Sequence, residues 1–186
     1  SDEFELHFQP YIHAKSGIIA GAEALLRWSS STLGAVGPAE FIPVAEQYGL
    51  VTEIDRWVMR NAMKTLSELK LAEKNIKISI NISNLHFHNR FFPEFMVNCM
   101  EEFDIGPDQF ELEITETAMT DLDDQFLEVA NSVSAIGVSL VLDDFGTGFT
   151  SLTHLSHLPI TKIKIDRSHV IEISTQTDGI RLVDVL

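Results

Sequence analysis

Five short strand-like segments of this chain carry a charged or amide residue where a buried strand would be apolar. The clearest is the apolar run 138–142, which ends in Asp143 and Asp144 just before a glycine-marked turn. An unpaired buried charge is costly, so such residues need a cation, a metal ion or a close partner. The pattern therefore predicts one metal-bearing site assembled from the ends of several strands. The other four segments contribute Glu23, Asn81, Glu113 with Glu116, and Lys164.

Strand-like and helix-like segments alternate along the whole chain, which favours βα units around a mainly parallel sheet. The turn at 15–17 is short, so the first two strands should pair antiparallel. We expect Thr52 and Asp121 each to cap a helix. The expected strands are 5–12, 18–26, 77–83, 110–115, 138–142 and 161–165. The expected helices are 38–48, 52–71, 91–103, 121–135, 151–158 and a C-terminal segment.

Repeats of this kind close as an eight-stranded barrel or open as a doubly wound sheet. A barrel carries its chemistry on the carboxyl ends of its strands, where the unusual polar residues of this chain lie. No glycine-rich loop of the dinucleotide or P-loop type is present. We therefore expect residues 1–186 to form one domain, an α/β barrel. A barrel of this class typically has about 250 residues, so this chain is expected to lack about two strands.

The composition excludes some partners. Thirteen basic residues against 28 acidic residues give a formal charge of −15, which disfavours binding to DNA or RNA polymers. A small phosphorylated ligand remains compatible if divalent cations supply positive charge locally. No apolar run reaches the roughly 20 residues of a membrane span, and the first residues do not resemble a signal peptide. The single cysteine, Cys99, suits a reducing compartment, so we expect a cytoplasmic domain without membrane contact.

Several motifs occur together and in order, and they resemble one family. The segment 23–28 reads Glu-Ala-Leu-Leu-Arg-Trp and resembles the signature of the EAL domain, a bacterial family that hydrolyses cyclic di-GMP. The resemblance implies a (β/α)8 TIM-like barrel with one antiparallel strand. It also implies hydrolysis of cyclic di-GMP to linear pGpG. The further matching segments are 6–10, 38–46, 81–83, 113–116, 143–148 and 164–166.

The resemblance also implies a role for individual residues, with Mg²⁺ or Mn²⁺ as a pair of bound ions. By resemblance the metal ligands are Glu23, Asn81, Glu113, Asp143 and Asp144, with Asp143 shared between the two ions. Lys164 would orient or deprotonate the attacking water, and the residues alone do not decide between these roles. Glu116 would hold the loop 143–149 in its working shape. The residues that would meet the substrate are Gln9, Leu25 and Arg27.

The family pattern continues past residue 186 with two further motifs, so the chain is expected to lack the last one or two strand–helix units. An alternative function is therefore a catalytically inactive EAL domain that binds cyclic di-GMP or a protein. A barrel hydrolase of another phosphoester is a third hypothesis. The resemblance further implies a homodimer formed near 150–158. It also implies GGDEF or sensor domains in the same protein, through which the protein could be tethered to a membrane.

Some of these residues also have simpler interpretations. Glu23 could form an ion pair with Arg27, and Asp143 with Asp144 could cap a helix. Glu111 is expected to be an exposed edge residue, in contrast to Glu113. His86 and His88 are expected to be surface or packing residues rather than metal ligands. The phenylalanines at 87, 91, 92 and 95 are expected to lie in the core or on a helix that packs against the barrel.

Overall fold

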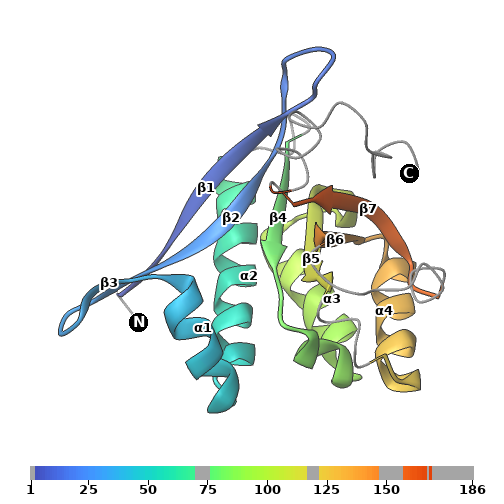
Figure 1. The fold of residues 1–186 in the computed structure, drawn as a ribbon. Helices are drawn as coiled ribbons and strands as arrows, with labels where there is room; N and C mark the ends of the chain where they lie inside the picture. Colours follow the sequence, from blue (N-terminus) through green and yellow to red (C-terminus); the bar gives the residue numbers. More distant parts are fainter. Residues whose placement is uncertain (1–2, 70–75, 117–121, 147–156, 167, 169–186) are drawn as a thin grey trace, which may run out of the picture.

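A computed structural model describes residues 3–69, 76–116, 122–146, 157–166 and 168 of the chain. Seven strands and four α-helices lie in these ranges, together with two short 3₁₀ helices (Figure 1). The first half contains β1 (Phe4–Ile12), β2 (Ile19–Ser30), β3 (Gly34–Val36), α1 (Pro38–Gln47) and α2 (Val51–Glu68). The rest contains β4 (Lys77–Asn81), η2 (Asn84–His88), α3 (Phe92–Phe103), η3 (Pro107–Gln109), β5 (Phe110–Thr115), α4 (Asp124–Ile136), β6 (Ser139–Phe145) and β7 (Ile160–Ile165).

The strands form one sheet in the order β1-β2-β4-β5-β6-β7, with the short strand β3 paired to β2. The first two strands pair antiparallel, as the short turn between them predicts. Strands β2, β4, β5, β6 and β7 run parallel to one another, so their carboxyl ends meet at one edge. The described part of this sheet is not closed: β1 and β7 are its two ends.

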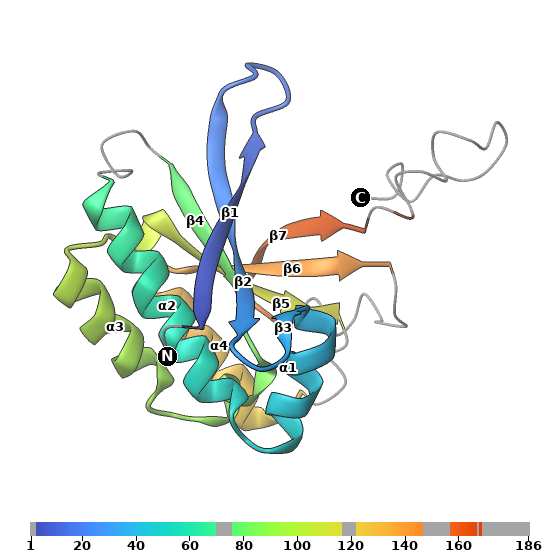
Figure 2. The same cartoon turned by 90° about the vertical axis from the view of Figure 1, so that its left-hand side faces the viewer.

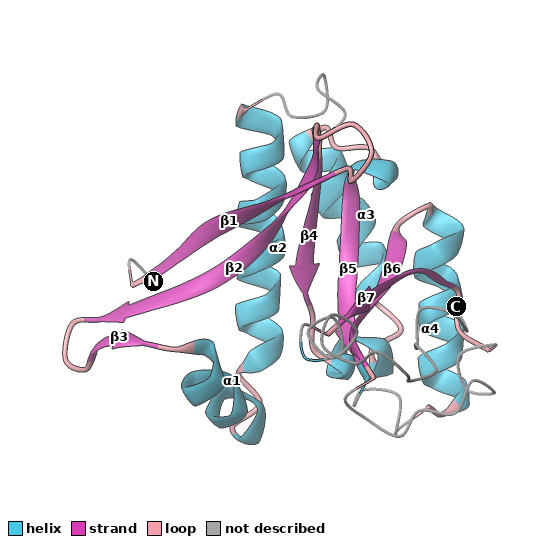
Figure 3. Ribbon diagram, turned by 45° about the horizontal axis from the view of Figure 1, so that its top comes forward, coloured by secondary structure: helices cyan, strands magenta, loops and turns pink. Residues whose placement is uncertain are grey.

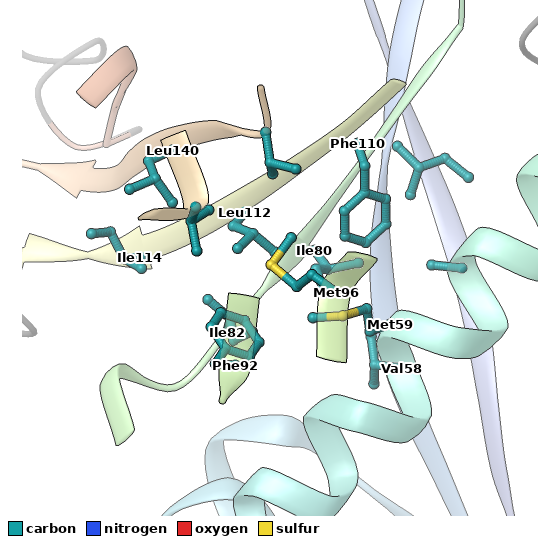
Figure 4. Close-up of a cluster of buried hydrophobic side chains, with 14 of the residues drawn as sticks. Val58, Met59, Ile80, Ile82, Phe92, Met96, Phe110, Leu112, Ile114 and Leu140 are labelled. Atoms are coloured by element: carbon teal, nitrogen blue, oxygen red, sulfur yellow. The ribbon is translucent and has the colours of Figure 1, made fainter. Parts of the chain in front are cut away.

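Helices cover one face of the sheet, and the apolar core lies between the two layers (Figures 2 and 3). Alternate residues of a strand point to opposite faces, so each central strand contributes every second residue to this core. Ile80 of β4, Leu112 of β5 and Leu140 of β6 are fully buried there. They pack against α2 and α3 through residues such as Met59 and Met96 (Figure 4).

The intervening residues of the same strands point to the opposite face, and apart from Val141 this set is polar. Ser79, Asn81, Glu111, Glu113 and Asp143 alternate with the core residues of β4, β5 and β6. Strand alternation therefore explains why polar residues interrupt these apolar segments: one face packs against the helices and the other carries charged groups. The sheet thus presents a row of carboxylates and amides toward its concave side.

Several boundaries differ from the sequence predictions. The helix α2 has Leu50 as its N-cap, so Thr52 lies inside the first turn and does not cap it. The helix α4 is capped by Asp123, whose carboxylate accepts a hydrogen bond from the backbone N–H of Phe126 at 2.7 Å, and the prediction of Asp121 is wrong. Strand β6 continues beyond Leu142 through both aspartates to Phe145.

The second strand also extends further than predicted, to Ser30, and returns as β3. The turn between them places Gly34 at φ +76°, a backbone region that glycine enters without steric cost. The predicted C-terminal helix, and nearly all of the predicted helix 151–158, lie outside the described residues. Among the described helices, none is long and apolar enough to cross a bilayer.

Candidate metal-binding site

Three carboxylates from three different strands converge on the concave side of the sheet. Glu23 of β2, Glu113 of β5 and Asp143 of β6 each place one oxygen within 4.8 Å of the others. The ladder explains the meeting: Glu113 lies beside Val141, and Asp143 lies beside Thr115, two residues further along β5 and on the same face. Residues more than a hundred positions apart thus form one group, which we call the carboxylate cluster. Sequence analysis predicts all three as metal ligands.

Lys164 of β7 lies at the centre of the carboxylate cluster. Its Nζ lies 2.8 Å from Glu113 Oε2, 3.0 Å from Glu23 Oε2 and 3.1 Å from Asp143 Oδ2. Burial by itself lowers the pKa of Lys164, but its hydrogen bonds to these carboxylates raise it above the ordinary value of a lysine. The ammonium form is therefore favoured, because neutralising it would leave three carboxylates facing one another.

The cluster holds an excess of negative charge. Three carboxylates face one ammonium, and the Glu113 side chain is only 3% exposed. Burial and the neighbouring charge of Glu23 raise the pKa of Glu113, against the opposing effect of Lys164. A buried excess of negative charge is unfavourable unless cations compensate it. Carboxylate oxygens are hard donors that suit Mg²⁺ or Mn²⁺, so the residues present fit such ions.

The two other predicted metal ligands lie beside the cluster. Asn81, at the end of β4, donates from Nδ2 to Glu23 Oε1 at 2.8 Å. Asp144 is not one of the three residues whose oxygens converge. Its backbone has a φ of +54°, a left-handed conformation, and its N–H donates to Asp143 Oδ1 at 2.9 Å. Burial and the charges of Asp143 and Asp166 raise the pKa of the Asp144 carboxyl.

Glu116 makes the contact that its predicted role requires. Its Oε2 accepts a hydrogen bond from the backbone N–H of Gly146 at 2.9 Å, and the residue is 3% exposed. Gly146 has a φ of +100°, where a residue with a Cβ would be strained. The contact ties the end of β5 to the turn that follows Asp143 and Asp144. Glu116 therefore holds the residue directly after the end of β6, the strand that carries two predicted ligands.

A cleft of about 600 Å³ opens beside the carboxylate cluster, at the carboxyl ends of β2, β4 and β5. Its walls include two of the three predicted substrate residues, Leu25 and Arg27, together with Asn81 and Glu113. The third, Gln9, lies on β1 directly across from Glu23 and is not part of the wall. Arg27 donates from Nη1 to the carbonyl of Leu26 at 2.8 Å. Glu23 instead binds Lys164 and Asn81, so the alternative of a Glu23–Arg27 ion pair is wrong.

Asp55, a buried acid of helix α2 that lines the cleft, was not predicted as a site residue. Its Oδ2 accepts a hydrogen bond from the backbone N–H of Ser83 at 2.9 Å, just after the strand that carries Asn81. His86 Nε2 lies 3.3 Å from the same oxygen, without the alignment of a hydrogen bond. One sequence signal could have identified Asp55: it is an acid between Ile54 and Val58, on the otherwise apolar side of an amphipathic helix.

Other simple interpretations were partly right. His86 is 1% exposed and packs against Phe92, with ring centroids 4.7 Å apart, so the packing interpretation is confirmed. Phe87 and Phe92 are in the core, whereas Phe91 is 59% exposed. Glu111 is the clear error: it is 2% exposed and binds Lys162, so it is not an exposed edge residue.

Comparison with known proteins agrees with this geometry. The family model described as the EAL domain matches residues 1–186. The chain belongs to the EAL domain family. Members of this family fold as TIM-like barrels, which confirms the predicted fold class, although the sheet described in this structure is not closed.

Several curated relatives are similar over most of the chain. "Biofilm architecture maintenance protein MbaA" of Vibrio cholerae is 41% identical over 89% of the chain, which covers 21% of that protein. "Oxygen sensor protein DosP" of Escherichia coli is 36% identical over 100% of the chain and 23% of that protein. "Cyclic di-GMP phosphodiesterase NbdA" of Pseudomonas aeruginosa is 35% identical over 92% of the chain and 22% of that protein. The EAL domain chain thus spans about a fifth of the length of these relatives.

Solved structures of EAL domains superpose well. A structure titled "PaMucR Phosphodiesterase, c-di-GMP complex" has a TM-score of 0.85 at 34% identity, over 95% of this chain and 72% of that chain. The FimX EAL domain of Pseudomonas aeruginosa, bound to c-di-GMP, has a TM-score of 0.82 at 26% identity, over 94% of this chain and 70% of that chain.

Proposed function

We propose that this EAL domain hydrolyses cyclic di-GMP to linear pGpG with Mg²⁺ or Mn²⁺ as cofactor. The observation that carries the proposal is the carboxylate cluster of Glu23, Glu113 and Asp143 beside a cleft walled by Leu25 and Arg27. The names of several relatives, including the cyclic di-GMP phosphodiesterase NbdA, support the same substrate. The structure titled as a c-di-GMP complex of a phosphodiesterase supports it independently.

The proposed metal ligands are Glu23, Asn81, Glu113 and Asp143 for one ion, and Asp143 with Asp144 for a second. When bound, such ions activate water and neutralise charge on the phosphodiester. Mg²⁺ and Mn²⁺ prefer oxygen ligands, and the proposed ligands on β2, β4, β5 and β6 supply such oxygens. Asn81 already contacts Glu23, and turning its amide would present its oxygen to the same ion.

The remaining residues have separate proposed tasks. Lys164 is proposed to orient or deprotonate the attacking water, and its contacts within 3.1 Å to three carboxylates support a role at the cluster. Glu116 holds the turn after Asp144 through Gly146. Arg27, in the wall of the cleft, provides a cation for a phosphate of the substrate, and Leu25 provides apolar contact. Gln9 is proposed as a further substrate contact from β1, across from Glu23.

The test is incubation of the purified protein with cyclic di-GMP and Mn²⁺, followed by chromatographic detection of pGpG. Glu23→Gln is the matched variant, because it keeps the size of the side chain and removes one ligand charge. Turnover by the wild type and its loss in E23Q are the expected results. Binding of cyclic di-GMP by the wild type without turnover would refute the hydrolytic function and support the alternative of an inactive binding domain.

We also propose that the domain acts in the cytoplasm, as a homodimer, in a protein that carries GGDEF or sensor domains. The name of MucR, a bifunctional diguanylate cyclase and cyclic di-GMP phosphodiesterase that is 36% identical to this chain, supports a neighbouring cyclase domain. Sedimentation of the purified protein tests the dimer, since a single species of one-chain mass at micromolar concentration would refute it.

A further inference from the structure

A second ionic cluster lies on the same face of the sheet as the carboxylate cluster, two residues earlier along β5. Its centre is Glu111, whose carboxylate lies 2.7 Å from Lys162 Nζ and 3.7 Å from Lys77 Nζ. The hydroxyl of Tyr11 donates to Glu111 Oε2 at 3.5 Å. The Glu111 side chain is 3% exposed, whereas the two lysines are more than 40% exposed. We call this group the lower cluster, and no residue of it has a role in the proposed reaction.

The lower cluster repeats the pairing of the site above it. Glu111 and Glu113 are two positions apart on β5, and Lys162 and Lys164 are two positions apart on β7. In the ladder, Val141 of β6 lies beside both Glu113 and Lys162, so Lys162 is level with Glu113. Its ammonium nevertheless binds Glu111. Two residues along a strand span about 6.6 Å, a distance that the flexible stem of a lysine can cover.

The backbone pairing between β7 and β6 is irregular. The ladder between these strands shifts twice, once between Leu140 and Val141 and once between Leu142 and Phe145. Regular backbone pairing therefore contributes less here than elsewhere in the sheet, and side-chain contacts decide where each lysine of β7 points. Glu111 is the carboxylate that holds Lys162.

Tyr11 supports this arrangement from the other end of the sheet. Its ring lies 5.4 Å from Lys162 Nζ, a cation–π contact between β1 and β7. The tyrosine fits because Gly21 faces it: a Cβ at position 21 would lie 2.1 Å from the Tyr11 hydroxyl oxygen. Burial and the charges of Glu111 and Glu113 raise the pKa of Tyr11, so its hydroxyl stays protonated and can donate. The Tyr11 ring and the Glu111 carboxylate thus both contact the Lys162 ammonium, and Gly21 leaves room for the ring.

We propose that Glu111 is a positioning residue that retains the Lys162 ammonium in the lower cluster and so leaves Glu113 to Lys164 and to the metal ions. The inference rests on the proposed function, because it assumes that Glu113 is a metal ligand. Without the charge of Glu111, Lys162 is level in the ladder with another buried carboxylate on the same face, Glu113. A second ammonium at the carboxylate cluster then competes with Mn²⁺ for the same oxygens.

The test measures Mn²⁺ affinity by electron paramagnetic resonance of free Mn²⁺ in four proteins: wild type, Glu111→Gln, Lys162→Met and the double variant. We expect E111Q to bind Mn²⁺ roughly tenfold more weakly, within the range seen when an outer-sphere partner of a metal ligand is removed. We expect K162M to bind at least as tightly as the wild type. The double variant E111Q/K162M should recover wild-type affinity, since the competing ammonium is gone.

The recovery separates this role from a purely structural one. If Glu111 only supported the fold, removing Lys162 as well would not restore the site, so a double variant as weak as E111Q would overturn the inference. Should E111Q fail to fold, as judged by circular dichroism, K162M still decides, because a loss of Mn²⁺ affinity in that variant contradicts the proposal. Glu23→Gln provides the remaining control. If the wild type binds no Mn²⁺, or E23Q binds as tightly as the wild type, the proposed metal site fails and the inference with it.

Discussion

Glu113→Gln is expected to stabilise the metal-free protein while it abolishes metal binding. The reason is the excess of negative charge in the carboxylate cluster. At an effective dielectric constant of about 20, like charges about 4.8 Å apart repel by roughly 3.5 kcal/mol. Glu113 meets two such partners, Glu23 and Asp143, whose oxygens lie within 4.8 Å. Its attraction to Lys164 Nζ, at 2.8 Å, is about 6 kcal/mol on the same scale.

The repulsions thus exceed the attraction by about 1 kcal/mol, before the cost of burying the Glu113 charge is added. Glutamine keeps the shape of the side chain and an oxygen that can accept from Lys164, and it removes the charge. We therefore expect the free energy of unfolding of E113Q to exceed that of the wild type by about 1 kcal/mol at pH 7 in EDTA. The variant should be more stable but inactive, as is common for substitutions at functional sites.

The gain should depend on pH in a defined direction. The pKa of Glu113 is raised in the folded protein, chiefly by burial. A carboxyl with a raised folded pKa contributes stability below its unfolded pKa and loses that contribution as the pH rises through the folded pKa. The advantage of E113Q over the wild type should therefore grow as the pH rises through the acidic range, and shrink where Glu113 is protonated in both states.

The assay is urea unfolding of both proteins in EDTA at several pH values, repeated with Mn²⁺. A ligand that binds only the folded state adds about 2.7 kcal/mol at 100 times its dissociation constant. Mn²⁺ should thus stabilise the wild type and leave E113Q unchanged, which reverses their order. An E113Q protein that is less stable than the wild type in EDTA at pH 7 would refute the argument from charge excess.

Three further substitutions test the fold around the site. Gly21→Ala should lower the free energy of unfolding by about 1–3 kcal/mol in urea titrations, because the new Cβ would clash with Tyr11 and with a backbone oxygen. Asp123→Ala should lower the free energy of unfolding by about 1 kcal/mol, because it removes the N-cap of α4. Asp124→Ala, inside the first turn, should lower it less, and equal losses would contradict the cap assignment. Asp55→Ala should lower the free energy of unfolding by about 1–3 kcal/mol and speed amide exchange at the end of β4. Unchanged exchange there would show that the hydrogen bond from Ser83 to Asp55 is not needed.

Residues of the site whose position follows from strand alternation and motif order were predictable from the sequence. Glu23, Glu113, Asp143 and Lys164 each sit among apolar residues in a strand-like segment, and parallel strands bring such positions to one edge. The structure gathers these four side chains, as the sequence analysis expects. The antiparallel first pair was predictable too, because the link between Ile12 and Ile19 is too short for the crossover that a parallel pair needs.

Residues whose environment depends on a distant partner were not predictable in the same way. Glu111 shares the face of Glu113, but its burial depends on Lys162, 51 residues later in the chain. Asp55 looks like an error in an apolar helix face until the backbone N–H of Ser83 is placed beside it. The cap of α4 was ambiguous for a local reason, since aspartates occupy positions 121, 123 and 124 around the start of the helix and only geometry selects Asp123.

The ion pair between Lys164 and Glu23 joins residues 141 positions apart. During synthesis at about 5–20 residues per second, the ribosome needs roughly 7–28 s after Glu23 to deliver its partner. Throughout that interval the nascent chain carries acidic groups whose compensating ammonium has not yet been made. Strand β7 therefore supplies the ammonium that compensates these carboxylates, so the carboxylate cluster can form only after the strands that carry its acids have waited for β7.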